Sequence, residues 1–217
     1  MIAFFIKQQD KLLEALFRHL EIVGLVLLIS IILAFLLTIL ILPRKSLSNI
    51  VIQIFNIIYS IPSLALFAIL IPFLGIGMKT AVFVLVLYNQ YILIRSNVEA
   101  LNSVDASVLE AAQGMGMSRW QILWKIRIPL AVPRMMGGIH LAVISTIGIT
   151  TIAATINAGG LGKILFDGLR TMNIYKILWG TIFSAGIALA ADFILRLVEA
   201  LLRRWLTPNE QNEAGLH

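Results

Sequence analysis

The chain alternates long apolar stretches with short charged clusters. Residues 22–42 contain no Asp, Glu, Lys or Arg, and about 20 apolar residues in an α-helix cross the ~30 Å hydrocarbon core of a membrane. Similar uncharged stretches recur along the chain, at 46–78, 80–94, 135–162 and 177–191. This pattern predicts an all-α polytopic membrane protein.

The composition supports the same class of protein. Hydrophobic residues make up 59% of the chain and charged residues only 13%, whereas roughly 25% of residues are charged in soluble domains. A soluble protein with an unusually apolar core, the alternative, would not need uncharged stretches of spanning length. Residues 22–42 are too long for the apolar part of a cleavable signal peptide, so we expect no such signal.

Residues 1–20 place charged side chains at intervals between apolar ones. This amphipathic pattern predicts a helix that lies in the membrane interface. We expect a transmembrane domain over residues 21–206 and a polar tail over 207–217.

The number of crossings depends on residues 46–78. They would form one long helix kinked at Pro62 and Pro72, or two crossings joined by a turn near Ser60. Cytoplasmic loops are enriched in Lys and Arg, and a single crossing places more of the 17 Lys and Arg residues inside than two crossings would. We therefore expect about five spans, with the amino end outside and the carboxyl end inside. The last three are expected near 78–101, 129–157 and 174–202.

The stretch LEAAQGMGMSRWQILWKIRIPLAVPR, residues 109–134, interrupts the apolar pattern between the third and fourth spans. Ser103 or Asp105 is placed to cap a helix at its start. Gly114 and Gly116 then predict a sharp turn. The orientation predicted above puts this stretch on the cytoplasmic side.

After the turn, Ser118 is placed to cap a second short helix, and Pro129 suits the first turn of the next crossing. Two short helices joined by a glycine turn would form a compact projection from the membrane. Ala111 and Ala112 predict a flat face on it that another surface can approach closely.

The spacing within this projection resembles that of a known family. Glu110-Ala111-Ala112, Gly116, Ile126 and Ile128-Pro129 are similar to the cytoplasmic loop signature of ABC importer permeases, with isoleucine at 128 where leucine is usual. The resemblance implies that residues 103–128 form a coupling loop that docks on a separate ATPase. It also implies the fold of a type I ABC importer permease, with a core like that of methionine permeases. The coupling residues it implies are Glu110, Ala111, Ala112, Gly114, Gly116, Met117, Ser118, Arg119, Ile126 and Pro129.

Three basic residues of the loop have two interpretations. Arg119, Lys125 and Arg127 either pair with acidic side chains of the ATPase or set the topology of the loop.

The resemblance extends along most of the chain. YSIPSLALFAILIPFLGIG, ISTIGITTIAATINAGGLG and RRWLTP look like segments of the osmoprotectant permeases, which import glycine betaine, choline and carnitine. The chain departs from their pattern at Asn157, where glycine is usual, at Ile92, where proline is usual, and in LAFLLTIL, which lacks the usual glycines and proline. Related permeases serve ergothioneine, methionine or other amino acids, so those solutes are the alternative.

The resemblance also implies partners at a bacterial inner membrane. These are two ABC ATPase subunits, a second permease copy or a sister permease, and an extracellular or periplasmic substrate-binding protein that selects the solute, typically through cation–π attraction. The net charge is +6, but the basic residues lie at span ends, where they meet membrane lipid, so we expect no nucleic acid partner.

No catalytic residue, cofactor or metal site is expected. The stretch AGGLGKI comes nearest to a phosphate-binding loop, but Asn157 stands at the first glycine position and Ile164 at the hydroxyl position. The chain has no cysteine, which excludes disulfides and thiolate metal sites. His140 lacks His or Cys at metal-ligand spacing and is expected to pack in its helix. Asp192 and Arg196, one turn apart, are expected to form an internal ion pair.

Weakly polar residues of the second to fourth spans are candidates for lining a solute path. Such a lining suits the transient passage of a zwitterion, and the alternative for each residue is an interhelical hydrogen bond or small-residue packing. The candidates are Tyr59, Ser60, Pro62, Tyr88, Asn89, Tyr91, Ser145, Thr146, Thr150 and Thr151, with Gln90 and Thr155 beside them.

Two other classes of function fit the sequence less well. An intramembrane enzyme would need His, Asp or Glu side chains that converge within the spans, and only His140 and Asp192 qualify, in different helices. An ion channel or a secondary transporter would have no use for the coupling signature.

Overall fold

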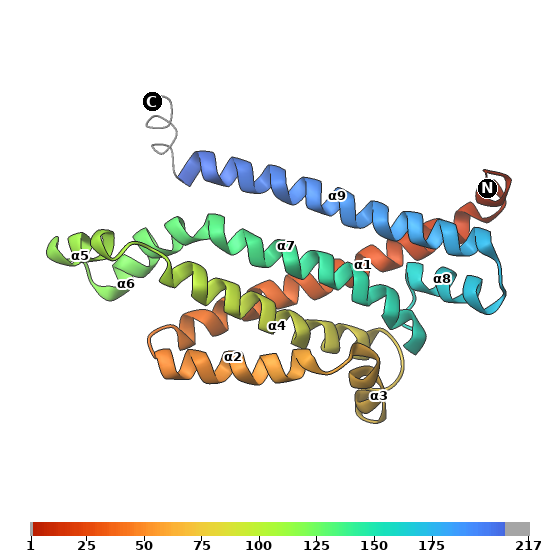
Figure 1. The fold of residues 1–217 in the computed structure, drawn as a ribbon, viewed down its shortest axis with the longest axis horizontal. Helices are drawn as coiled ribbons and strands as arrows, with labels where there is room; N and C mark the ends of the chain where they lie inside the picture. The colour runs from red at the N-terminus through yellow and green to blue at the C-terminus, as the bar shows by residue number, and fades with distance from the viewer. Residues whose placement is uncertain (1, 207–217) are drawn as a thin grey trace.

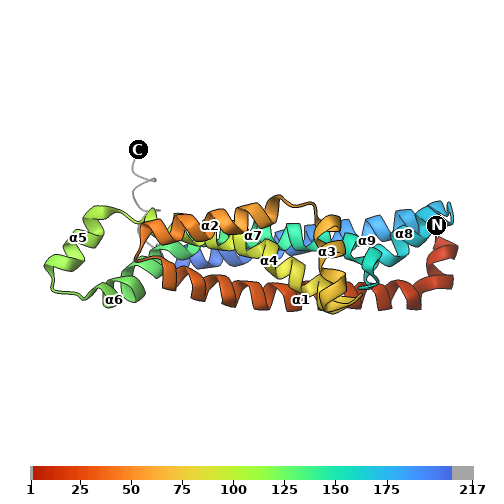
Figure 2. The same ribbon diagram turned by 90° about the horizontal axis from the view of Figure 1, so that it is seen from below.

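The computed structural model describes residues 2–206, and every regular element in that range is helical. The long helices lie side by side, and two short helices project beyond one end of the bundle (Figures 1 and 2). The predicted all-α fold is confirmed. The predicted polar tail, 207–217, lies outside the described residues. The elements are α1 (Ile2–Ile41), α2 (Lys45–Ser60), α3 (Ser63–Leu74), α4 (Met78–Asn102), α5 (Ala106–Gly114), α6 (Arg119–Ile122), the π-helical segment η1 (Leu123–Arg127), α7 (Ile128–Ala153), the 3₁₀ segment η2 (Ala154–Ile156), α8 (Leu161–Arg170) and α9 (Ile174–Leu206).

Helix α1 runs without interruption for 40 residues, about 60 Å at 1.5 Å per residue. Residues 2–20 contain no glycine or proline, so nothing ends the helix before the first span begins. The predicted amphipathic helix and the first span are thus one continuous helix. The interfacial position of its first part stays a prediction. The helix ends at Ile41, shortly before Pro43, which disfavours helical geometry at the residue before it.

Helices α2 and α3 meet at a bend of 96°. Pro62 forces Ile61 into an extended conformation, with φ −72° and ψ 130°, and the Tyr88 hydroxyl donates to the Ile61 carbonyl at the break. Helix α3 has 12 residues, about 18 Å of helix, too short to cross the hydrocarbon core alone. The turn predicted near Ser60 is present, yet α2 and α3 together are long enough to cross the membrane only once, as one broken span.

Helix α4 lies at the centre of the bundle. Its most apolar window is 67% buried, against 33% in α1, because α1, α2 and α7 all pack against it. Helix α7 comes close to α4 at Gly138, where an added Cβ would lie 2.4 Å from the Cβ of Ser96. Small residues therefore set the distance between these two helices.

The remaining helices complete the bundle. By length and composition, α1, α4 and the stretch Arg119–Ile156 qualify as membrane spans, and α2 with α3 counts as a fourth if the bent pair is one span. Helix α9 packs along α7 (Figure 1) and contains the uncharged stretch 177–191. Its place as the fifth span stays a prediction.

Candidate functional sites: the projecting loop and two cavities

The projecting loop begins with a capped helix. The Asp105 carboxylate accepts from the backbone N–H of Ser107 at 2.9 Å, and this hydrogen bond lowers the pKa of Asp105. Of the two predicted caps, Asp105 is therefore correct. Ser103 instead follows the last turn of α4, where its hydroxyl donates to the Ala100 carbonyl at 2.8 Å.

The turn after α5 depends on Gly116, whose φ is +79°. L-residues other than Asn and Asp rarely adopt this left-handed region. Helix α6 then begins at a reciprocal cap: the Gln121 N–H donates to Ser118 Oγ at 3.2 Å, and the Ser118 N–H donates to Gln121 Oε1 at 2.8 Å. The two predicted helices, the glycine turn and the Ser118 cap are all present.

The sequence predicts a separate second helix in the loop, before the next span. In the structure this helix instead continues into the span. Helix α6 passes through η1 into α7 as one continuous helix, and the Ile128 N–H bonds to the Leu123 carbonyl, five residues back. Pro129 has no N–H, and in a regular α-helix its ring would clash with the carbonyl of Lys125. The π-helical turn accommodates the proline without breaking the helix. The loop is thereby joined rigidly to α7.

Two arginines fasten the loop to the end of α4. Arg127 donates to the Leu101 carbonyl at 2.8 Å and to Asn102 Oδ1 at 2.7 Å. Arg134 donates to the Ser103 carbonyl at 2.9 Å. These cations satisfy the carbonyls that a helix end leaves unpaired. Arg127 is thus engaged within the chain.

The outer surface of the loop is apolar. Met115 and Trp120 are 74% and 61% exposed, and Trp120 stacks edge-on against Trp124, with ring centroids 5.7 Å apart. Ala111 is exposed but Ala112 is buried, so the flat face predicted for both alanines contains only Ala111. The other predicted coupling residues are exposed or half-buried on this loop: Glu110, Gly114, Gly116, Met117, Ser118, Arg119, Ile126 and Pro129.

The predicted path-lining residues fall into two groups. Asn89 is buried and donates to Thr146 Oγ1 at 2.9 Å and to Ser30 Oγ at 3.3 Å. These hydrogen bonds join α4 to α7 and α1. They are the interhelical bonds that were the alternative to lining a solute path. Thr150 is also buried in the bundle. The less buried group comprises Tyr59, Ser60, Pro62, Tyr91, Ser145 and Thr151.

A cavity of about 620 Å³ lies between α2 and α4, at the end near the loop. Of its lining residues, only Tyr91 is among the predicted path-lining residues. The others include Asn49, Gln53 and Asn56 on α2 and Arg95 on α4. The helical spacing of the three amides was the signal in the sequence, but only the structure shows which helix they face.

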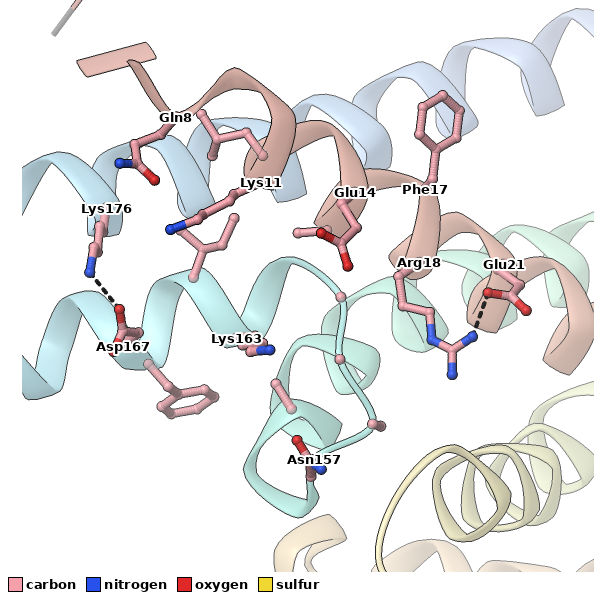
Figure 3. Close-up of a pocket in the computed structure, with 18 of the residues that line it drawn as sticks. Gln8, Lys11, Glu14, Phe17, Arg18, Glu21, Asn157, Lys163, Asp167 and Lys176 are labelled. Atoms are coloured by element: carbon pink, nitrogen blue, oxygen red, sulfur yellow. Dashed lines mark hydrogen bonds and ion pairs between the residues drawn. The ribbon is translucent and has the colours of Figure 1, made fainter. Parts of the chain in front are cut away.

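A second cavity, of about 1330 Å³, lies at the opposite end, between the first part of α1, the turn after η2 and α8. Its lining carries charges of both signs (Figure 3). Asp167 accepts from Lys176 at 2.5 Å and from Arg170 at 2.9 Å. The Lys176 ammonium, and next the Arg170 guanidinium, hold the pKa of Asp167 below its usual range.

His140, predicted to pack in its helix, also approaches two acidic side chains that the sequence did not place near it. Its Nε2 lies 3.9 Å from Asp192 and its Nδ1 lies 3.8 Å from Glu199, both on α9. Asp192 also pairs with Arg196 at 2.7 Å, as predicted. Within the part of the chain that the structure describes, no group of three His, Cys, Asp or Glu residues is placed to hold a metal ion. The cluster joins α7 to α9.

Comparison with known proteins identifies the family. The family described as binding-protein-dependent transport system inner membrane component matches residues 24–207. The chain is 36% identical to the osmoprotectant import permease protein OsmW of Salmonella typhimurium over 191 residues, 86% of this chain and 89% of that protein. It is 32% identical to the glycine betaine/carnitine/choline transport system permease protein OpuCB of Bacillus subtilis over 199 residues, 92% of each.

The fold is also that of a solved transporter. The MetNI methionine ABC transporter, in an inward-facing conformation, matches with a TM-score of 0.83 over 90% of this chain and 98% of the matched chain, at 20% identity. The helical bundle and the projecting loop agree with these similarities in sequence and in fold. The chain belongs to the family of binding-protein-dependent transport system inner membrane components, and it is a membrane-embedded permease subunit.

Proposed function

We propose that this chain forms the translocation path of an ATP-driven importer for quaternary-amine osmoprotectants such as glycine betaine, choline and carnitine. Relatives that match it over most of their length are named for these solutes. The solute, the assembly and the coupling described below are parts of the proposal.

The single observation that carries the coupling mechanism is the continuity of α6, η1 and α7. It places the glycine turn at one end of a helical stretch, Arg119–Ile156, that runs the length of the bundle. An exposed apolar surface outside the membrane is typical of a protein interaction site, and Met115 and Trp120 form such a surface. An ATPase that grips this surface would move α7 with it, because packed helices shift between discrete arrangements.

The assembly in this proposal has two ABC ATPase subunits, a second permease copy or a sister permease, and a substrate-binding protein. ATP binding closes the ATPase pair, draws the two coupling loops together and opens the path outward, and hydrolysis resets it. This chain is non-catalytic, since AGGLGKI lacks the first glycine and the hydroxyl of a phosphate loop.

An importer for another small solute, an amino acid above all, is the alternative. The matched methionine transporter bears on the fold alone at 20% identity. Uptake of labelled glycine betaine, choline and methionine by the reconstituted complex separates the two. Uptake of methionine alone would reject the quaternary-amine proposal.

The docking proposal is tested with two single cysteines, because the chain has none of its own. Met115 and Met172 are 74% and 89% exposed, and they follow α5 and α8, which lie at opposite ends of the molecule (Figure 1). Met115→Cys should crosslink to the ATPase, and Met172→Cys should not. In intact cells a membrane-impermeant maleimide should label Met172→Cys and spare Met115→Cys. The reverse labelling would reject both the orientation and the coupling role.

A further inference from the structure

Helix α2 carries a polar face within an uncharged segment. Asn49, Gln53 and Asn56 recur at helical spacing, while Ile54, on the other side of the helix, is exposed. A polar helix face is unfavourable against lipid and is found against protein or a water-filled cavity. The three amides line the cavity of about 620 Å³, so this cavity is the polar environment that the helix needs.

The opposite wall of the cavity holds an ordered cation. Arg95 Nε donates to Glu99 Oε1 at 2.8 Å, and its Nη1 donates to the Tyr91 hydroxyl at 2.8 Å. Among the described residues its Nη2 has no hydrogen-bond partner. The Arg95 side chain is 53% exposed and lines the cavity. The guanidinium is thus held in place while donors remain available to a carboxylate.

The Tyr91 ring is part of this wall, and behind it two further rings, Tyr59 and Tyr88, continue toward the bend between α2 and α3. The Tyr91 ring lies 5.1 Å from that of Tyr59, which lies 5.5 Å from that of Tyr88. Arg95 stands 5.9 Å from the Tyr91 centroid, at the outer limit of a cation–π contact. The ring is therefore still able to attract a quaternary ammonium group.

We infer that Tyr91 and Arg95 form a solute subsite within the permease, for a small zwitterion that carries a quaternary ammonium and a carboxylate. The ammonium lies against the Tyr91 ring, and the carboxylate accepts from the Arg95 guanidinium. This inference rests on the proposed function for the solute class. It adds that the permease itself distinguishes a betaine from choline, which has no carboxylate.

The test compares two solutes in proteoliposomes that contain the permease, its ATPase and its binding protein. Arg95→Gln should lower glycine betaine uptake about tenfold, the effect of losing one charge-assisted hydrogen bond, and leave choline uptake within about twofold. Tyr91→Leu should lower the uptake of both solutes about threefold to tenfold, because both have the ammonium. The matched control is Arg44→Gln, at the exposed start of α2 and outside the cavity, which should change neither.

A binding measurement separates the inference from the proposed function. Glycine betaine titrated calorimetrically into the permease–ATPase complex without the binding protein should bind saturably, and Arg95→Gln should abolish that binding while the complex still assembles. Transport by the wild type without such binding, or an equal loss of both solutes in Arg95→Gln, overturns the subsite and leaves the function standing. Binding without transport of either solute overturns the function and leaves the subsite standing.

Discussion

Both ends of the bundle have glycine-rich turns, but the glycines serve different physical purposes. At the loop end, a Cβ added at Gly114 or Gly116 would meet nothing within 4 Å, and Gly116 is needed only for its φ of +79°. At the opposite end, a Cβ at Gly162 would lie 1.9 Å from the Thr151 carbonyl oxygen, and one at Gly160 would lie 3.1 Å from Nδ1 of His19.

The loop turn depends on backbone conformation alone, whereas the far end depends on close packing as well. The loop glycine sets the direction of the chain and leaves the surface open to a partner. At the far end Gly162 allows two backbones to touch, and Gly160 both packs against His19 and has a positive φ of +76°. Substitutions at the far end should therefore change stability, and those in the loop should change function.

The largest effect is expected from Gly162→Ala. The new methyl group would overlap the backbone of Thr151, which cannot move without shifting α7, so we expect a loss of about 3 kcal/mol in the free energy of unfolding. The thermal unfolding midpoint of the purified complex measures it. Gly186→Ala, where a Cβ meets nothing within 4 Å, is the control. Equal midpoints for the two variants would show that the far end is not tightly packed.

A smaller loss of stability with a larger loss of function is expected from Gly116→Val. A β-branched residue in the left-handed region costs roughly 1–2 kcal/mol, and the altered turn misplaces the surface around Met115. Uptake should fall to background while membrane insertion remains near wild type and the unfolding midpoint falls by less than in Gly162→Ala. Gly116→Asn, which tolerates this region, should retain most uptake. Wild-type uptake in a well-expressed Gly116→Val variant would contradict the coupling role.

The smallest effect is a local loss of stability at acid pH, because a carboxylate stabilises a helix at each end of the bundle. The pKa values of Asp105 and Asp167 are both lowered from the usual 3.8. Their stabilising contribution is therefore present above pH 3.8 and is lost as the pH falls through the lowered values. Protection from hydrogen exchange, measured against the intrinsic rate at each pH, should fall in α5 and α8 over that window.

Matched substitutions make the acid prediction specific. Asp167→Asn should accelerate exchange in α8 at neutral pH and leave α5 unchanged, and Asp105→Ala should do the reverse. Exchange that rises equally in both helices in either variant would mean that the two ends unfold together.

The sequence predicted the spans more fully than their contacts. The third and fifth segments were predicted at 78–101 and 174–202, and the structure has helices at Met78–Asn102 and Ile174–Leu206. These bounds were predictable because hydropathy and the flanking glycine, proline and polar residues are local signals. The same holds for the Asp105 and Ser118 caps. Local patterns cannot show how a helix is rotated about its axis against its neighbours.

That rotation accounts for what sequence reasoning missed. His140 meets Asp192 and Glu199 only because α9 returns along α7, about fifty residues later. For Asn89 the sequence left two interpretations, path lining or an interhelical hydrogen bond, and only its position between α1 and α7 shows the hydrogen bonds that it donates. The cavity beside Arg95 requires two helices to turn their polar faces toward each other, which no single stretch encodes.

The π-helical turn at Leu123–Arg127 has a consequence for the aim of the loop. One residue corresponds to about 100° of rotation about a helix axis, and a π-helical turn holds one residue more than an α-helical turn. A π-helical turn and an α-helical turn with one residue fewer cover about the same rotation, so deleting one residue within Leu123–Arg127 should leave both α7 and the loop in place. Deleting one residue from the regular helix next to it would instead rotate the loop by about 100° relative to α7, because no wide turn there absorbs the change.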